Sequence, residues 1–183
     1  MNHIATPTDF RYPWYMRLIF WWQRRRYGRE FEPVRLWGRI PRAFLAMSAM
    51  YRVLDRTTSP IEPVLRSLIQ VRVSQINLCP FCIDLNSAIG FQRGVSDEKL
   101  AALAQSADSM LFTEREQAAI EFAQAVTRGD RPVDAELIAR LRRHFDDQAI
   151  VELAALIAYQ NMSSKFNAAL GVPAQGFCVT INR

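Results

Sequence analysis

Between residues 41 and 171, apolar side chains recur at helical spacing in one segment after another. Of the features of this sequence, this periodicity restricts the possible folds most strongly. The tail beyond it has β-type residues but no partner strand, and the chain shows no fixed-period repeat. We therefore predict an all-α helical bundle. Its helices are predicted at 41–55, 61–77, 79–93, 97–105, 114–127, 135–145 and 147–170.

Residues that typically begin or end helices bound several of these segments. Thr113 followed by Glu116 has the spacing of a capping box, and Ser96 and Asp134 are suited to cap the helices that follow them. Gly171 is suited to end the last long helix. These local signals agree with the periodicity.

The chain of 183 residues fits one domain with an extension. We predict an N-terminal arm at 1–42, a helical domain at 43–171 and a C-terminal tail at 172–183. The arm has nine Arg and three acidic residues, a net charge of +6, whereas the whole chain has +5. Because the basic character belongs to the arm, the composition does not favour a nucleic-acid-binding domain.

The arm also contains all four tryptophans of the chain. Its aromatic and basic residues fit an amphipathic helix at a lipid surface, or binding of a phosphate backbone, or packing against protein. We expect packing against protein, largely between the subunits of a homo-oligomer. The expected anchors are Trp14, Trp21, Trp22 and Trp37.

No window of 18 consecutive apolar residues is present, so no membrane span is predicted. The first residues lack the basic and apolar regions of a secretory signal, and three cysteines do not form a secreted disulfide framework. We expect a cytoplasmic protein.

The segment "NLCPFCIDLNS" places Cys79 and Cys82 in a CxxC motif. With a helix beginning near Cys79, both cysteines and Asn86 share one face, and Pro80 suits the first turn. The positive end of the helix dipole favours a thiolate there, so the pattern supports a dithiol–disulfide pair. Two inert buried cysteines are an alternative interpretation.

A zinc site would need more ligands than the CxxC motif provides. The other candidates, Cys178, His3 and His144, each stand alone in the sequence. We therefore expect no metal and no cofactor. His144, between Arg residues and Phe145, is expected at the surface, and Cys178 is expected to be a lone thiol.

The stretches "RSLIQVRVSQINLCPFCIDLNSA", "FTEREQAAIEFAQAVTR" and "HFDDQAIVELAALIAYQNMSSKFNAALG" resemble the alkylhydroperoxidase D-like, or carboxymuconolactone decarboxylase, family over about residues 41–171. The resemblance implies an all-α domain that forms homo-oligomers. It also implies that Cys82 attacks a hydroperoxide and that Cys79 resolves the sulfenic acid into a disulfide.

Redox members of that family carry a proton relay made of a Glu twelve residues before the first cysteine and a His four residues after the second. The corresponding residues here are Ser67 and Asn86, and neither exchanges a proton near neutral pH. Peroxide reduction is therefore expected to be slower than in members with both groups. If the helix terminus alone decided reactivity, Cys79 would be the better nucleophile.

The predicted function is a thiol-dependent oxidoreductase, either a peroxidase or a disulfide reductase, with a thiol or dithiol electron donor. Alternatives are a non-catalytic ligand-binding protein on the same fold and a lyase-like member without redox chemistry. The predicted supporting pocket contains Ser67, Gln70, Ser74, Asn86 and Asp84. Ser67, Gln70 and Ser74 share a helix face that fits either a polar pocket or a solvated stripe, and Asp84 points away from the sulfurs in a straight helix.

Overall fold

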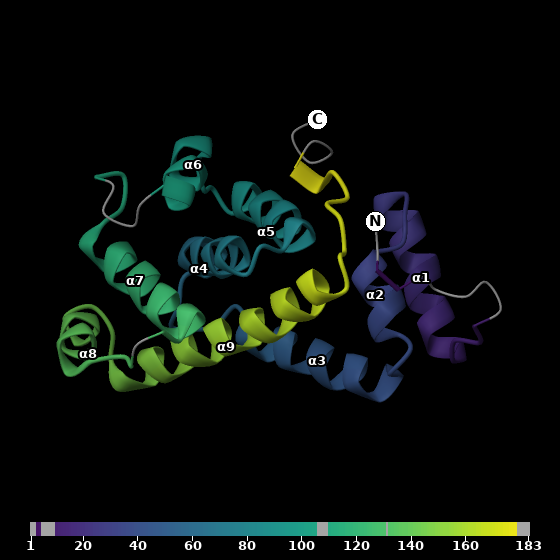
Figure 1. Ribbon diagram of the computed structural model, residues 1–183, viewed down its shortest axis with the longest axis horizontal. Helices are drawn as coiled ribbons and strands as arrows, with labels where there is room; N and C mark the ends of the chain where they lie inside the picture. The colour runs from purple at the N-terminus through teal and green to yellow at the C-terminus, as the bar shows by residue number, and fades with distance from the viewer. Residues whose placement is uncertain (1–2, 5–9, 106–109, 131, 179–183) are drawn as a thin grey trace.

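The computed structural model describes residues 3–4, 10–105, 110–130 and 132–178, and within these ranges it contains nine α-helices and no β-strand (Figure 1). The predicted all-α fold is confirmed. The helices are α1 (Trp14–Tyr27), α2 (Glu32–Trp37), α3 (Pro41–Leu54), α4 (Pro63–Ile76), α5 (Pro80–Gln92), α6 (Asp97–Gln105), α7 (Glu114–Arg128), α8 (Ala135–Arg142) and α9 (Asp147–Ala169).

Caps predicted from the sequence are present. Thr113 and Glu116 form both halves of a capping box at α7, and the Asp134 carboxylate accepts the Leu137 N–H at 2.8 Å at the start of α8. Ser96 accepts the Lys99 N–H at 3.3 Å, and Gly171 follows α9 with φ +67°. Local side-chain chemistry therefore explains where these helices begin and end.

Helix α4 lies at the centre of the bundle, where it packs against α5, α6, α7 and α9 (Figure 1). All residues from Leu65 to Ser74 are buried, polar ones included. The main apolar core forms where α4, α7 and α9 meet, and it includes Leu68, Ile69, Ile120, Leu153 and Ile157. Helix α5 packs on α4 directly after a short turn, so the CxxC motif lies against the most buried helix of the molecule.

The arm packs on the domain through part of its aromatic side chains. Met16 and Phe20 of α1 are buried with Trp37, whose ring stacks on Phe166 of α9 with centroids 4.0 Å apart. Three other tryptophans remain 72%, 52% and 53% exposed, namely Trp14, Trp21 and Trp22. Contact of these three with a second subunit stays a prediction.

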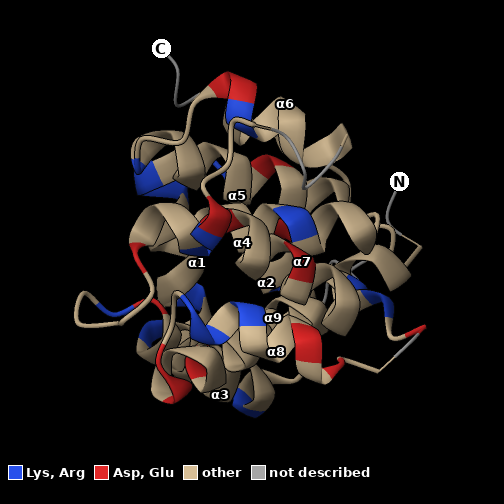
Figure 2. Cartoon of the chain, turned by 90° about the vertical axis from the view of Figure 1, so that its left-hand side faces the viewer, with Lys and Arg blue, Asp and Glu red and all other residues tan. Residues whose placement is uncertain are grey.

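Charged residues of both signs are intermixed over the side of the molecule drawn in Figure 2. Several are paired in the described ranges, including Arg24 with Glu30 in the arm. None of the helices in the described ranges is long and apolar enough to cross a membrane.

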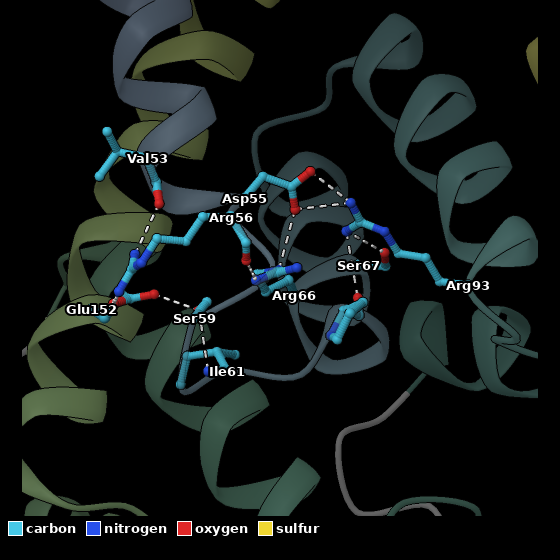
Figure 3. A network of polar contacts seen from close by, with 10 residues as sticks. Val53, Asp55, Arg56, Ser59, Ile61, Arg66, Ser67, Arg93 and Glu152 are labelled. Atoms are coloured by element: carbon cyan, nitrogen blue, oxygen red, sulfur yellow. Dashed lines mark hydrogen bonds and ion pairs between the residues drawn. The ribbon is translucent and has the colours of Figure 1, made fainter.

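A network of ion pairs joins the end of α3 to α4 and α5 (Figure 3). Asp55 accepts two hydrogen bonds from Arg93, at 2.7 and 2.8 Å, and lies 3.2 Å from Nε of Arg66. Arg66 is almost fully buried and also donates to the Arg56 carbonyl at 2.9 Å. The network fixes α3 against the helix pair that carries the cysteines.

Candidate functional site around Cys79 and Cys82

The two cysteines lie at the start of α5, as predicted. Cys79 is the N-cap residue, and its Sγ accepts the Cys82 backbone N–H at 3.2 Å. Pro80 occupies the first helical turn, where its missing N–H costs no hydrogen bond. A disulfide bond joins Cys79 to Cys82, and both residues are buried.

A cavity of about 220 Å³ lies beside Cys82. Cys82 lines it, whereas Cys79 is not among its lining residues. Its apolar walls come from α2, α3 and α5 and include Phe31, Trp37, Met47, Phe81, Leu85 and Ile89. No Lys, Arg, His, Asp or Glu is among the lining residues. The cavity therefore suits a small, largely apolar ligand next to one of the two sulfurs.

One wall of the cavity is polar and centres on Ser74 of α4. The Ser74 hydroxyl donates to the Gln70 carbonyl at 2.6 Å and accepts from Asn86 Nδ2 at 3.2 Å and from Gln160 Nε2 at 3.0 Å. Gln70, Asn86 and Gln160 line the cavity, and Ser74 lies directly behind them with no exposed surface. The polar face of α4 is thus buried rather than solvated. Since the Ser74 hydroxyl is already donating, it has no proton left for a substrate.

Ser67 lies two turns before Ser74 and is outside the cavity lining. It is fully buried, and its hydroxyl accepts from Arg93 Nη1 at 3.3 Å. A Cβ atom built on Gly90 of α5 would lie 3.5 Å from the Ser67 Cβ, so the two helices approach closely here. At this position the chain has an arginine-bound hydroxyl instead of a titratable carboxyl group.

Two tyrosines of the cavity lining were not foreseen from the sequence. Burial, together with the neighbouring Asp55 carboxylate, raises the pKa of Tyr51 to about 12. Burial likewise raises the pKa of Tyr159, and the rings of these two residues lie 5.9 Å apart. Both phenols therefore stay protonated at neutral pH.

Asn167 of α9 was also missed by sequence reasoning. Its Nδ2 donates to Cys82 Sγ at 3.3 Å, and the residue is only 2% exposed. The usable signal was a run of polar residues at helical spacing inside an apolar helix, formed by Gln160, Ser164 and Asn167. Such a run predicts a buried polar face, although not the partner that it meets.

Asp84 binds the C-terminal tail instead of the cavity. Its carboxylate accepts the backbone N–H groups of Gln175, Phe177 and Cys178 at 2.9, 3.0 and 3.0 Å. The Cys178 thiol donates to the Asp84 carbonyl at 3.2 Å. We call Asp84 together with residues 175–178 the tail clasp. It holds Phe177 against Phe31 and Phe81, in the same apolar cluster as the two cysteines.

The tail clasp gives a pH-dependent prediction. Burial raises the pKa of the Asp84 carboxyl, but the N–H groups of Cys178, Phe177 and Gln175 outweigh this effect, so the pKa lies below its ordinary value of 3.8. Because the folded-state pKa is the lower one, the clasp stabilises the tail fully at neutral pH. It loses that contribution only as the pH falls through the lowered pKa.

At neutral pH, Asp84→Ala should release the tail, because three backbone donors lose a charged acceptor. We expect amide exchange at Phe177 and alkylation of the Cys178 thiol to accelerate by roughly tenfold or more. In the unsubstituted protein, burial and the Asp84 carboxylate raise the pKa of Cys178 to about 11. Asp84→Ala removes the carboxylate and exposes the thiol, and both effects favour the reactive thiolate. Asp130→Asn, at an exposed position, is the control, and equal rates in both variants would contradict the clasp.

Within the described ranges, no group of three or more His, Cys, Asp or Glu residues is placed to hold a metal ion. His144 is half-buried beyond α8, and Cys178 is a free cysteine within the tail clasp. The fold and the site together define an all-helical protein that has a CxxC disulfide at a helix start and an apolar cavity beside the second cysteine.

Comparisons with known proteins agree with this description. The Carboxymuconolactone decarboxylase family matches residues 41–125. The uncharacterised protein YnjA of Escherichia coli K12 is 44% identical over 175 residues, which cover 96% of each chain. The chain therefore belongs to the carboxymuconolactone decarboxylase family.

Two solved structures show the same fold. One is from Agrobacterium tumefaciens, a protein of unknown function for which an antioxidant defence role of the AhpD type has been suggested. It is 27% identical with a TM-score of 0.69, and the match covers 73% of this chain and 91% of that one. The other is an uncharacterised peroxidase-related protein from Silicibacter sp. TM1040. It is 21% identical with a TM-score of 0.84, and the match covers 97% and 94% of the two chains.

Proposed function

We propose that this protein is a thiol peroxidase that reduces small organic hydroperoxides through Cys82 and Cys79. The observation that carries the proposal is the unequal placement of the two bonded cysteines, since Cys82 lines the apolar cavity and Cys79 does not. An apolar cavity favours an organic hydroperoxide over hydrogen peroxide because the organic group buries its surface there. The suggested antioxidant role of the Agrobacterium relative is compatible with this chemistry.

In the proposed reaction, the Cys82 thiolate attacks the terminal oxygen of R–O–O–H. A sulfur–oxygen bond forms, the O–O bond breaks, and the leaving alkoxide takes a proton and departs as ROH. Sulfur is oxidised by two electrons and the hydroperoxide is reduced by two. The Cys79 thiol then attacks the sulfenic sulfur, the disulfide forms, and water leaves. A dithiol supplies two electrons and two protons to regenerate both thiols.

Counting thiols tests the proposal. The reduced chain has three cysteines, and one equivalent of cumene hydroperoxide should remove two thiols and leave the Cys178 thiol, which is alkylated once the protein is denatured. Mass spectrometry should find Cys79 and Cys82 unalkylated within one peptide whose mass is lower by two hydrogens, and dithiothreitol should restore both thiols. A matched reaction with hydrogen peroxide should be slower. Three thiols that remain alkylable after stoichiometric hydroperoxide would refute the proposal.

A second candidate function is binding of an apolar ligand without turnover, with cysteines that only pack. The same cavity of about 220 Å³ favours it, because an apolar ligand needs no reactive sulfur. The thiol count separates the two functions, since inert thiols together with saturable binding of an aromatic ligand would support the second.

A further inference from the structure

We propose that Asn167 is a catalytic residue of this thiol peroxidase: its side-chain amide stabilises the Cys82 thiolate by donating a hydrogen bond to the sulfur. The inference rests on the proposed function for its catalytic meaning. In the structure the amide meets the sulfur of the Cys79–Cys82 disulfide, and the proposal extends this contact to the reduced protein, where it is measurable without any turnover.

The position of the amide supports this role. Asn167 Nδ2 lies 3.3 Å from Cys82 Sγ, and no other described side chain donates a hydrogen bond to that sulfur. The end of α9 is held in place because the Asn167 backbone carbonyl accepts the Val172 N–H at 3.0 Å. The donor is therefore presented to the sulfur by a fixed helix end.

Two other amides of the cavity wall already donate to a neighbouring hydroxyl. Asn86 and Gln160 both donate to the Ser74 hydroxyl, and that hydroxyl donates to the Gln70 carbonyl. These side chains hold one another in place and leave Asn167 as the donor directed at the sulfur. The two positions that correspond to the family's proton relay, Ser67 and Asn86, lie on α4 and α5, whereas this donor comes from α9.

The electrostatic surroundings make a neutral donor important. None of the described cavity-lining residues is Lys, Arg, His, Asp or Glu, and besides Cys82 the titratable ones are Tyr51 of α3 and Tyr159 of α9. Both have raised pKa values and stay neutral. Around Cys82, the tail provides the Cys178 thiol, and α5 provides the Asp84 carboxylate, which is held by the tail. The described surroundings therefore offer the thiolate the start of α5 and the Asn167 amide in place of a cation.

The carbonyl oxygen of the Asn167 amide can act after Cys82 has attacked the hydroperoxide. Asn167 Oδ1 is buried and has no hydrogen-bond partner in the described structure. The sulfenic hydroxyl would be formed on the sulfur that the same amide already contacts, and a hydroxyl can donate to an unpaired carbonyl oxygen. One amide group thus offers a donor to the thiolate and an acceptor to the oxidised product.

The test isolates Cys82 as a single thiol by combining Cys79→Ser with Cys178→Ser. In this background, the pH dependence of iodoacetamide alkylation, followed by mass spectrometry, gives a midpoint for the thiolate. Asn167→Leu keeps the number and branching of the side-chain heavy atoms and removes the donor, so the midpoint should rise by about one pH unit. Asn167→Gln, which keeps an amide, should shift it less. Lys165→Ala, at an exposed position on the same helix, should leave it unchanged.

An unchanged midpoint in folded Asn167→Leu protein would overturn the inference. If that variant does not fold, NMR of the Asn167 side-chain amide in protein that keeps Asn167 provides a second measurement. In the reduced single-thiol protein, the side-chain amide resonances of Asn167 should shift with the same pH midpoint as alkylation, and resonances that do not titrate would refute it. Hydroperoxide turnover is measured separately, so a confirmed hydrogen bond without turnover would count against the proposed peroxidase only.

Discussion

Replacing Cys82 with serine should reduce hydroperoxide consumption to the uncatalysed rate, whereas replacing Cys79 with serine should leave one turnover intact. The reason is geometric: only Cys82 meets the cavity in which the substrate is proposed to bind. A serine hydroxyl stays protonated at neutral pH and is a weak nucleophile toward the peroxide oxygen. In Cys79→Ser protein, the sulfenic acid on Cys82 should persist and be trapped by dimedone.

Serine is a suitable replacement at both positions. Cys79 caps α5 with its sulfur, and serine is among the preferred N-cap residues, so Cys79→Ser should retain the helix start. Cys178→Ser is the control, and it should consume hydroperoxide like the unsubstituted protein. If Cys82→Ser protein reacted instead and dimedone trapped a sulfenic acid on Cys79, the assignment of the two roles would be reversed.

Removing the Asp55 carboxylate should destabilise the protein by about 3 kcal/mol, at the lower end of the range for breaking a buried ion pair. Arg66 is 3% exposed, and in Asp55→Asn it would keep its charge without a counter-ion. Burial already lowers the pKa of Arg66, and Asp55 opposes that effect. The expected loss of stability lies at the lower end of the range because Asp55 and Arg93 are each 18% exposed and therefore partly solvated.

The measurement is urea unfolding at neutral pH, in which the midpoint should fall while the slope stays constant. The melting temperature should decrease by roughly 10 °C for a chain of this size. Asp147→Asn breaks an ion pair with Arg142 whose side chains are 75% and 60% exposed, so it is a matched control with an expected loss below about 1 kcal/mol. Equal losses in the two variants would show that the Asp55 network contributes no more than a surface pair.

Sequence patterns predicted the helical bundle and its caps because these depend on neighbouring residues. They also brought together Gln70, Ser74 and Asn86, since α4 and α5 are joined by a short turn and their contacts are local. Local sequence patterns could not predict that α2 and α3 form walls of the cavity, or that α9 provides the hydrogen-bond donor to Cys82. Asn167 meets Cys82 across 85 residues of sequence, and periodicity does not determine which helices become neighbours.

The arm and Asp84 show the same limit. Tryptophan content predicted that the arm packs through its aromatic rings, but it could not separate Trp37, which stacks on Phe166, from the three exposed tryptophans. For Asp84, helical geometry indicated that the side chain leaves the sulfur face. The backbone donors of the tail that it binds lie more than ninety residues away along the chain.

The close packing around Ser67 has an evolutionary consequence. Ser67 has no exposed surface, faces Gly90 across the α4–α5 contact and accepts a hydrogen bond from Arg93, which itself binds Asp55. A glutamate at position 67 would add three heavy atoms to a filled space and a second carboxylate competing for one guanidinium. A single mutation there would therefore cost stability before it could help proton transfer. In this chain, a carboxylate at position 67 would therefore require that several core residues change together.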